Sequence, residues 1–173
     1  EGGSRQDEIF KKFIALVHEN CIAEREETFY ANRVRHAFTM HMITHVRPNG
    51  KIAARRLELW SRQGGYTSHG HGVTENSIDA FNHIYRYDAC KDDGWTVYTN
   101  TPSGGAMRAY GFPQMLFGVE SQIEEIAKKL NMDSLELRRM NMMPVGFVNG
   151  FNLAENFYDS LNQCIDRGLE VFD

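Results

Sequence analysis

A strand-like run and a long amphipathic helix meet at the segment Tyr98-Thr99-Asn100-Thr101-Pro102-Ser103-Gly104-Gly105-Ala106-Met107-Arg108-Ala109-Tyr110-Gly111-Phe112-Pro113-Gln114. Trp95 to Thr99 enters the segment as a strand, and the helix starts at Phe112-Pro113, since proline is favoured in the first helical turn. The three glycines between them permit positive φ angles and allow another group to approach the backbone closely. The segment is therefore a predicted loop between a strand and a helix.

Two side chains of this loop carry binding chemistry. Arg108 offers a planar fork of donors to a carboxylate, phosphate or carbonyl oxygen, and Tyr110 offers a flat face to a ring. Backbone N–H groups left free just before a helix N-terminus also suit an anion or oxyanion. Chemistry alone leaves two alternatives: a loop that binds an anionic or heteroaromatic ligand, or a glycine-rich turn with a solvated arginine.

Length and composition limit the class of protein. The 173 residues are 42% hydrophobic and 24% charged, which predicts one soluble globular domain over residues 1–173 with one core. A net charge of −4 argues against nucleic acid as a partner, because there is no basic excess to neutralise phosphates. No apolar run approaches the roughly 20 residues of a membrane span, and no signal peptide is visible.

The cysteines indicate a reducing compartment. Cys21, Cys90 and Cys164 are widely spaced and odd in number, which fits separate thiols in a cytoplasmic protein and not a disulfide framework. Without a Cys-x-x-Cys pair, this segment is not expected to hold an iron–sulfur cluster by itself. The chain starts with Glu1 and not methionine, so we expect an excised piece or a processed product.

Alternating and turn-forming residues predict two β-hairpins. Residues 36–46 alternate with the period of a strand, residues 47–51 contain an Asn-Gly turn, and residues 52–62 return as a second strand. A second hairpin is predicted from residues 87–90 and 95–99, with the turn at Asp92-Asp93-Gly94.

Helical periodicity predicts about four or five helices. They cover residues 7–19, residues 73–86 with Thr74 as N-cap, residues 112–130, a segment capped by Asp133, and a last helix ended by Gly168. The run at residues 63–72 is rich in glycine and is predicted to be a flexible connection. The fold class is therefore α+β: two or three hairpin-like units packed against about four or five helices.

Histidines raise the alternative of a zinc site. His41 and His45 share a strand face, and His69 and His71 follow in the sequence. No cysteine or carboxylate lies at a spacing that would complete four ligands, and strand histidines are commonly half-buried amphipathic residues. We predict no metal site in this chain and no catalytic role for His69 or His71.

The loop resembles a known family. The string from Thr101 to Gln114, followed by an acidic helix and Asp133-Ser134-Leu135-Glu136-Leu137-Arg138-Arg139-Met140-Asn141, is similar to the molybdopterin-binding large subunit of the xanthine dehydrogenase and aldehyde oxidase family. Arg33-Val34-Arg35-His36-Ala37 adds to the resemblance, which covers most of the chain. Bacterial xanthine dehydrogenase-like and nicotinate dehydrogenase-like members look nearest.

The resemblance implies roles for particular residues. Arg108 would bind or polarise a substrate oxygen as charge develops, and Tyr110 would stand where the family has an aromatic residue that packs on the substrate ring. The backbone of Gly105 and Ala106 would contact the molybdenum cofactor. In the glycine-rich start of the chain, Gly3 would touch the cofactor, and Gln6 would match the active-site glutamine or glutamate of the family.

The same resemblance implies an activity and its partners. The chain would be a fragment of a molybdopterin-binding subunit that hydroxylates an N-heterocycle or aldehyde with oxygen from water. Its partners would be the remainder of that subunit and the 2Fe-2S and FAD domains or subunits.

Some residues depart from the family pattern. No arginine stands where some xanthine-oxidising relatives orient their substrate, and Phe81 or its neighbours occupy that place, which puts xanthine in doubt as substrate. The family's catalytic glutamate has no counterpart, so we expect the isolated chain to hold no molybdenum and to be inactive. A non-catalytic interaction domain and a free-standing small-ligand binder that uses Arg108 and Tyr110 are the alternatives.

Overall fold

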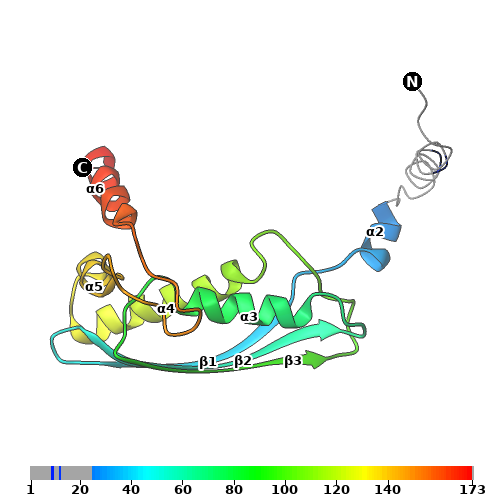
Figure 1. Ribbon diagram of the computed structural model, residues 1–173, viewed down its shortest axis with the longest axis horizontal. Coiled ribbons are helices and arrows are strands. Elements are labelled where there is room, and N and C mark those ends of the chain that lie inside the picture. Colours follow the sequence, from blue (N-terminus) through cyan, green and yellow to red (C-terminus); the bar gives the residue numbers. More distant parts are fainter. Residues whose placement is uncertain (1–8, 10–11, 13–24, 173) are drawn as a thin grey trace. The chain divides into compact units, whose positions relative to one another are not determined.

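The computed structural model describes residue 9, residue 12 and residues 25–172 (Figure 1). The chain divides into two compact units, Glu1–Asn32 and Arg33–Asp173. In the first unit, the helix α2 covers Arg25–Ala31. The predicted helix at residues 7–19 lies outside the described residues except for residues 9 and 12.

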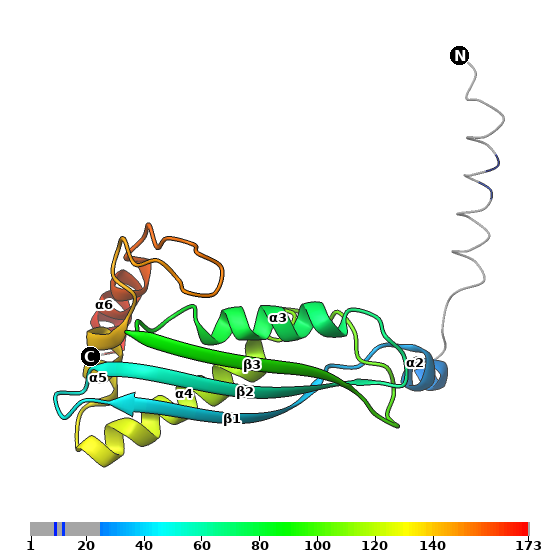
Figure 2. The same ribbon diagram turned by 60° about the horizontal axis from the view of Figure 1, so that its bottom comes forward.

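The second unit is built on a three-stranded sheet in the order β1-β2-β3 (Figure 2). The strands are β1 (Ala37–Val46), β2 (Ile52–Gly64) and β3 (Ala89–Tyr98). β1 and β2 are antiparallel, so the first predicted hairpin is confirmed. Gly50 has a φ of 84° in the connecting turn, as an Asn-Gly turn requires.

The second predicted hairpin is wrong. Residues 89–98 form the single strand β3, and β3 runs parallel to β2 because the helix α3 (Gly70–Phe81) crosses over between them. Gly94 serves packing and not a turn: a Cβ atom there would lie 2.7 Å from Cδ1 of Ile78 on α3. Asp92 accepts a hydrogen bond from the Asn82 side chain just after α3, which explains a carboxylate inside the strand.

α3 and the long helix α4 (Phe112–Leu130) cover one face of the sheet (Figure 1). Their buried side chains and those of β2 form one core, which includes Leu57, Leu59, Ile78, Phe81, Met115, Val119 and Ile123. α4 lies close to β1, since a Cβ atom at Gly118 would be 2.8 Å from Cε of Met42. The predicted bounds of α4 are confirmed, with proline in its first turn. The α+β prediction, with about four or five helices, is also confirmed, although the sheet is mixed.

α3 begins earlier than predicted. The glycines of residues 70 and 72 belong to its first turn, with His69 at the N-cap position, so the predicted flexible connection is wrong there. Thr74 is not the N-cap: its hydroxyl donates to the Gly70 carbonyl (3.0 Å) and lies 2.7 Å from the Thr96 hydroxyl. The missing side chain at Gly70 allows this approach, because a Cβ atom would lie 2.8 Å from Cγ2 of Thr96.

Two helices follow α4. α5 (Ser134–Asn141) is capped as predicted by Asp133, whose carboxylate accepts from the N–H groups of Leu135 and Glu136. α6 (Ser160–Phe172) continues through Gly168, so the predicted end at this glycine is wrong. No described helix is long and apolar enough to cross a membrane.

A polar cluster is buried between α3 and the sheet. The guanidinium of Arg55 lies 3.8 Å from the ring centroid of Phe81 and donates to the Phe81 carbonyl. Arg55 pairs in register with Cys90 on β3, and the Cys90 thiol donates to Asp92 at 3.1 Å. Burial and the neighbouring carboxylate raise the pKa of Cys90 to about 12, while burial lowers the pKa of Arg55 to about 10.

We expect Leu59→Ala to lower the free energy of unfolding by about 2–5 kcal/mol, because Leu59 is fully buried in β2 and its truncation leaves a cavity. Urea denaturation measures the change. Leu161→Ala on α6 is the control: this side chain is 50% exposed, and we expect a change within about 0.5 kcal/mol. Equal losses in both variants would contradict the assigned core.

We expect iodoacetamide at pH 8 to label Cys90 roughly a hundredfold more slowly than the exposed Cys164, since a raised pKa leaves little thiolate. Below that pKa, the Cys90 rate climbs about tenfold per pH unit. Asp92→Asn speeds Cys90 labelling because it removes the negative charge beside the thiol. Peptide mass spectrometry measures each site, and equal rates at neutral pH would refute this assignment.

Candidate functional site

The loop at residues 99–111 connects β3 to α4, and its first half is joined to neighbouring backbone. The N–H of Gly104 donates to the Gln63 carbonyl at 2.7 Å, and the N–H of Gly105 donates to the Val34 carbonyl at 3.1 Å. Val34 in turn donates to the Ser103 carbonyl and forms a parallel bridge with Gly104. These two glycine amides are therefore already used within the chain.

Because both glycines lack a Cβ atom, side chains of the segment before β1 can pack directly against their backbone. A Cβ atom at Gly104 would lie 2.7 Å from Nε2 of His36, and one at Gly105 would lie 2.2 Å from Cδ of Arg33. His36 is buried, its Nδ1 is 3.0 Å from the Ser61 hydroxyl, and burial lowers the pKa of this imidazole. In the described part of the chain, Nε2 of His36 has no hydrogen-bond partner. A neutral imidazole thus lies behind the loop.

The second half of the loop has an unusual backbone. Ala109, Tyr110 and Gly111 have φ angles of 66°, 49° and 100°, in the left-handed region. This conformation costs roughly 1–2 kcal/mol for each residue with a Cβ atom. Two turn bonds support it, from the N–H of Tyr110 to the Met107 carbonyl and from the N–H of Phe112 to the Ala109 carbonyl. The neighbouring packing must supply the remaining stabilisation.

Arg35 supports the loop from the segment before β1. Its guanidinium donates to the Arg108 carbonyl at 3.1 Å and to Oε1 of Gln114 at 3.2 Å. The Gln114 amide then donates to the His36 carbonyl at 3.1 Å, which ties the first turn of α4 to the same segment. Two predicted motifs, Arg33 to Ala37 and the loop, therefore lie together.

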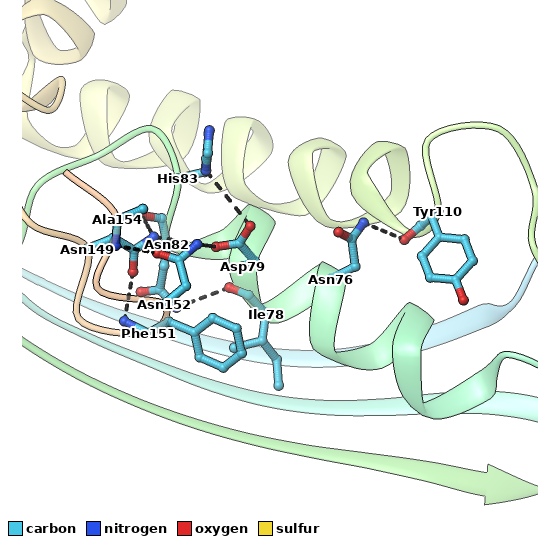
Figure 3. A network of polar contacts seen from close by, with 10 residues as sticks. All are labelled: Asn76, Ile78, Asp79, Asn82, His83, Tyr110, Asn149, Phe151, Asn152 and Ala154. Atoms are coloured by element: carbon cyan, nitrogen blue, oxygen red, sulfur yellow. Dashed lines mark hydrogen bonds and ion pairs between the residues drawn. The ribbon is translucent and has the colours of Figure 1, made fainter. Parts of the chain in front are cut away.

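Tyr110 is held by α3. Figure 3 shows the side-chain amide of Asn76, which donates to the Tyr110 carbonyl at 2.8 Å. The Tyr110 hydroxyl lies 2.9 Å from Nδ1 of His69, and the two rings meet edge to face with centroids 6.0 Å apart. Gly72 lies beneath this hydroxyl, because a Cβ atom there would be 3.1 Å from it.

The Arg108 side chain projects from this loop without a counter-charge. It is exposed, and no carboxylate or carbonyl within residues 25–172 pairs with its guanidinium. The N–H groups of residues 106–109 likewise donate to no acceptor in the described part of the chain. This set of free donors fits an anionic or oxygen-rich group, as the sequence predicts for the loop.

The remaining predictions concern the start of the chain and the histidines. Gln6 and Gly3 lie outside the described residues. Nδ1 of His41 lies 3.1 Å from Oε2 of Glu58 on the neighbouring strand. Among the residues that the structure describes, no group of three or more histidine, cysteine or acidic side chains is arranged to hold a metal ion.

Helix α3 also holds the segment that follows α5. Figure 3 shows the Asp79 carboxylate, which accepts from the side-chain amides of Asn149 and Asn152, the latter at 2.7 Å. Asn149 further donates to the Asn82 carbonyl. Phe81, which we predicted near the substrate region, is buried below Arg55.

A cavity of about 410 Å³ opens beside this segment, and its lining includes His83, Phe112, Met143, Tyr158 and Leu161. It does not include Arg108 or Tyr110. The free donors, and not this cavity, define the candidate site, because neither Arg108 nor Tyr110 faces the cavity.

The supporting side chains were missed in the sequence. Arg35 belongs to a motif that the sequence singled out, but its contact with Arg108 depends on the distant pairing of Val34 with Gly104. Asn76 and His69 gave no signal, since their partner lies more than thirty residues away.

Comparisons with known proteins identify the family to which the chain belongs. The family model described as the molybdopterin cofactor-binding domain matches residues 18–142. The chain is 36% identical over 149 residues to the xanthine dehydrogenase molybdenum-binding subunit of Escherichia coli O157:H7, which covers 86% of this chain and 20% of that protein. It is 33% identical over 154 residues to the nicotinate dehydrogenase large molybdopterin subunit of Eubacterium barkeri, which covers 87% of this chain and 36% of that protein.

Among solved structures, the aldehyde oxidoreductase from Desulfovibrio gigas superposes with a TM-score of 0.77 at 29% identity, over 82% of this chain and 15% of that one. Quinoline 2-oxidoreductase from Pseudomonas putida 86 gives a TM-score of 0.78 at 21% identity, over 87% of this chain and 20% of that one, and shows the fold alone. The chain spans about a fifth of the length of the E. coli relative. With the family model matched over most of the chain, these likenesses show that the protein belongs to the molybdopterin cofactor-binding domain family.

Proposed function

We propose that this chain is a segment of a molybdenum-dependent hydroxylase that acts on an N-heterocycle or an aldehyde. One observation carries the proposal: Arg108, two residues before Tyr110 in the same loop, is exposed and has no counter-charge in the described part of the chain. The relatives named as xanthine dehydrogenase, nicotinate dehydrogenase and aldehyde oxidoreductase support this class of reaction. Because the chain spans only part of each, the activity of the whole protein is inferred.

Arg108 is assigned to substrate binding and charge stabilisation. Its guanidinium donates to a carboxylate or carbonyl oxygen of the substrate and stabilises negative charge that develops during the reaction. Tyr110 follows two residues later in the same loop, and its ring is assigned to packing against a planar substrate. An arginine–aromatic pair of this kind selects a flat molecule with an oxygen acceptor, without deciding between an N-heterocycle and an aromatic aldehyde.

The free donors of the loop also fit a molybdopterin cofactor. The amide of Ala106 has no acceptor in the described part of the chain, while the backbone of Gly105 lies directly before it and is fixed by Val34. We assign these two residues to cofactor contact, together with Gly3 at the start of the chain, and we assign Gln6 a catalytic role as the active-site glutamine beside the metal. When bound, the molybdenum cofactor supplies the redox chemistry that inserts oxygen from water, and this chain supplies position and electrostatics.

The remaining parts of the enzyme lie outside this segment. We assign residues 1–173 to one domain of a molybdopterin-binding subunit, with the rest of that subunit and iron–sulfur and FAD components as partners, in the cytoplasm. We do not propose xanthine as the substrate, since this chain has Phe81 in the region where some xanthine-oxidising relatives have an arginine that orients the substrate. The ring of Phe81 is buried below Arg55.

We expect molybdenum and pterin in this chain only when it is co-expressed with its partner subunits. The reason is that the loop supplies only part of the donors that a bulky cofactor requires. Metal and pterin analysis of the protein purified alone and with its partners measures this. A cofactor-loaded, active chain purified alone would contradict the assignment, and a folded chain without molybdenum in both preparations would favour the alternative of a non-catalytic binding domain.

We expect Arg108→Ala and Arg108→Lys to lower kcat/KM of the co-expressed enzyme by about 10- to 100-fold. A charge-assisted hydrogen bond contributes ~1.5–3 kcal/mol, and lysine lacks the planar fork. Arg167→Ala on α6 is the control, because this arginine is exposed and bonds only Glu170 nearby. Molybdenum content is measured in each variant, and full activity of a cofactor-loaded Arg108 variant would refute the role.

A further inference from the structure

The conformation of Tyr110 requires support from outside the loop. Ala109 and Tyr110 both carry a Cβ atom and both lie in the left-handed region. Such a conformation persists only where surrounding contacts over-determine it. The question is which side chains do so, and whether they act on the backbone, on the ring, or on both.

Helix α3 contacts Tyr110 at its two ends. Asn76 donates to the Tyr110 carbonyl at 2.8 Å, and this carbonyl follows directly from the left-handed backbone of the residue. His69 faces the opposite end of the side chain, with Nδ1 2.9 Å from the hydroxyl. Figure 3 shows the first contact, with the Tyr110 ring extending away from Asn76.

The first turn of α3 is shaped for this hydroxyl. At Gly72 a Cβ atom would lie 3.1 Å from the Tyr110 oxygen and 3.5 Å from Cε1 of the ring, so a side chain there would crowd the phenol. His69 occupies the N-cap position without capping α3 through its side chain, which leaves the imidazole available to Tyr110. The presence of His69 and Gly72 in this turn is therefore explained by their packing against Tyr110, and not by the needs of helix formation.

We propose that His69 and Asn76 are positioning residues that fix the ring and the backbone of Tyr110, and through them the direction of Arg108. The proposal rests on the function assigned above to Arg108 and Tyr110. It also refines the substrate class: because His69 engages the hydroxyl, Tyr110 offers the substrate a ring surface and not a hydrogen-bond donor. The substrate portion next to Tyr110 is an apolar planar ring, and its oxygen acceptor faces Arg108.

Trypsin provides a test that needs no cofactor, because its cleavage after Arg108 requires the loop to open. We expect His69→Ala and Asn76→Ala in the full chain each to raise the rate of this cleavage about fivefold, the factor that corresponds to a net hydrogen-bond contribution of ~1 kcal/mol. Cleavage after Arg55, which is 3% exposed in the central strand, reports global unfolding and is expected to stay unchanged. Mass spectrometry of early peptides measures both rates.

Two neighbours on the same helix are matched controls. His71 and Glu75 are exposed, and their side chains make no hydrogen bond within the described part of the chain, so His71→Ala and Glu75→Ala are expected to leave cleavage after Arg108 unchanged. Asn76→Asp keeps the shape but removes the donor, and is expected to behave like Asn76→Ala. Equal acceleration in the controls, or none in the His69 and Asn76 variants, would overturn the proposal.

A double-mutant cycle separates positioning from a general loss of helix stability. In a Tyr110→Phe background the hydroxyl is absent, so we expect His69→Ala to accelerate cleavage no further. A full additional acceleration in that background would overturn the role of the hydroxyl contact.

The proposed function is tested separately, in the co-expressed enzyme. There we expect His69→Ala to raise KM for an aromatic heterocyclic carboxylate such as nicotinate, with equal molybdenum content. A loosened loop with an unchanged KM would support the positioning and overturn the substrate role of Tyr110, so the two failures are distinguishable.

Discussion

Close packing of α3 against β3 and against the start of α4 is the constraint on which the site depends. The contacts occur at glycines: a Cβ atom at Gly94 would lie 2.7 Å from Ile78, and one at Gly111 would lie 2.1 Å from the Ser77 hydroxyl. These two approaches hold the strand that leads into the loop, and the last residue of the loop at residues 99–111, against one helix. A larger residue at either position would push α3 away, and the loop would lose the surface that holds Tyr110.

The loop then combines backbone strain with support from different elements. Arg35 reaches the Arg108 carbonyl from the segment before β1, and Asn76 reaches the Tyr110 carbonyl from α3. Each bond contributes about 1 kcal/mol, similar to the cost of a left-handed residue with a Cβ atom. The loop can therefore hold an unfavourable conformation without losing order, which is what a site that presents two side chains in a fixed direction requires.

The sequence predicted the elements whose signals are local. The Asn-Gly hairpin, the long stripe of α4 and the Asp133 cap all depend on neighbours within a few residues, and all three are confirmed. The predicted second hairpin failed because Asp92-Asp93-Gly94 has the composition of a turn, while Asp92 and Gly94 in fact contact residues that are distant in the sequence. The side chain of Ile78 on α3 packs against Gly94, and the Asp92 carboxylate accepts a hydrogen bond from the Asn82 side chain.

The same distinction applies to the candidate site. Arg108 and Tyr110 stood out because a glycine-rich loop between a strand and a helix is a recognisable local pattern. His69 was assigned no catalytic role and its segment was predicted to be flexible, since nothing nearby shows that its imidazole meets a residue 41 positions later. Long-range contacts of this kind arise only after the parallel crossover brings α3 beside the loop.

Electrostatics explain why Arg108 can remain free in an acidic protein. The chain has a net charge of −4, yet two of the carboxylates of α4 pair with another arginine: Glu120 and Glu124 both bind Arg138, and the latter contact lowers the pKa of Glu124. Behind the loop, burial lowers the pKa of His36, so this imidazole stays neutral and neither adds to nor cancels the charge of Arg108. The arginine is therefore available to an anionic or carbonyl oxygen, and in the proposed site the specificity would rest on the ring of Tyr110, which α3 holds through His69 and Asn76.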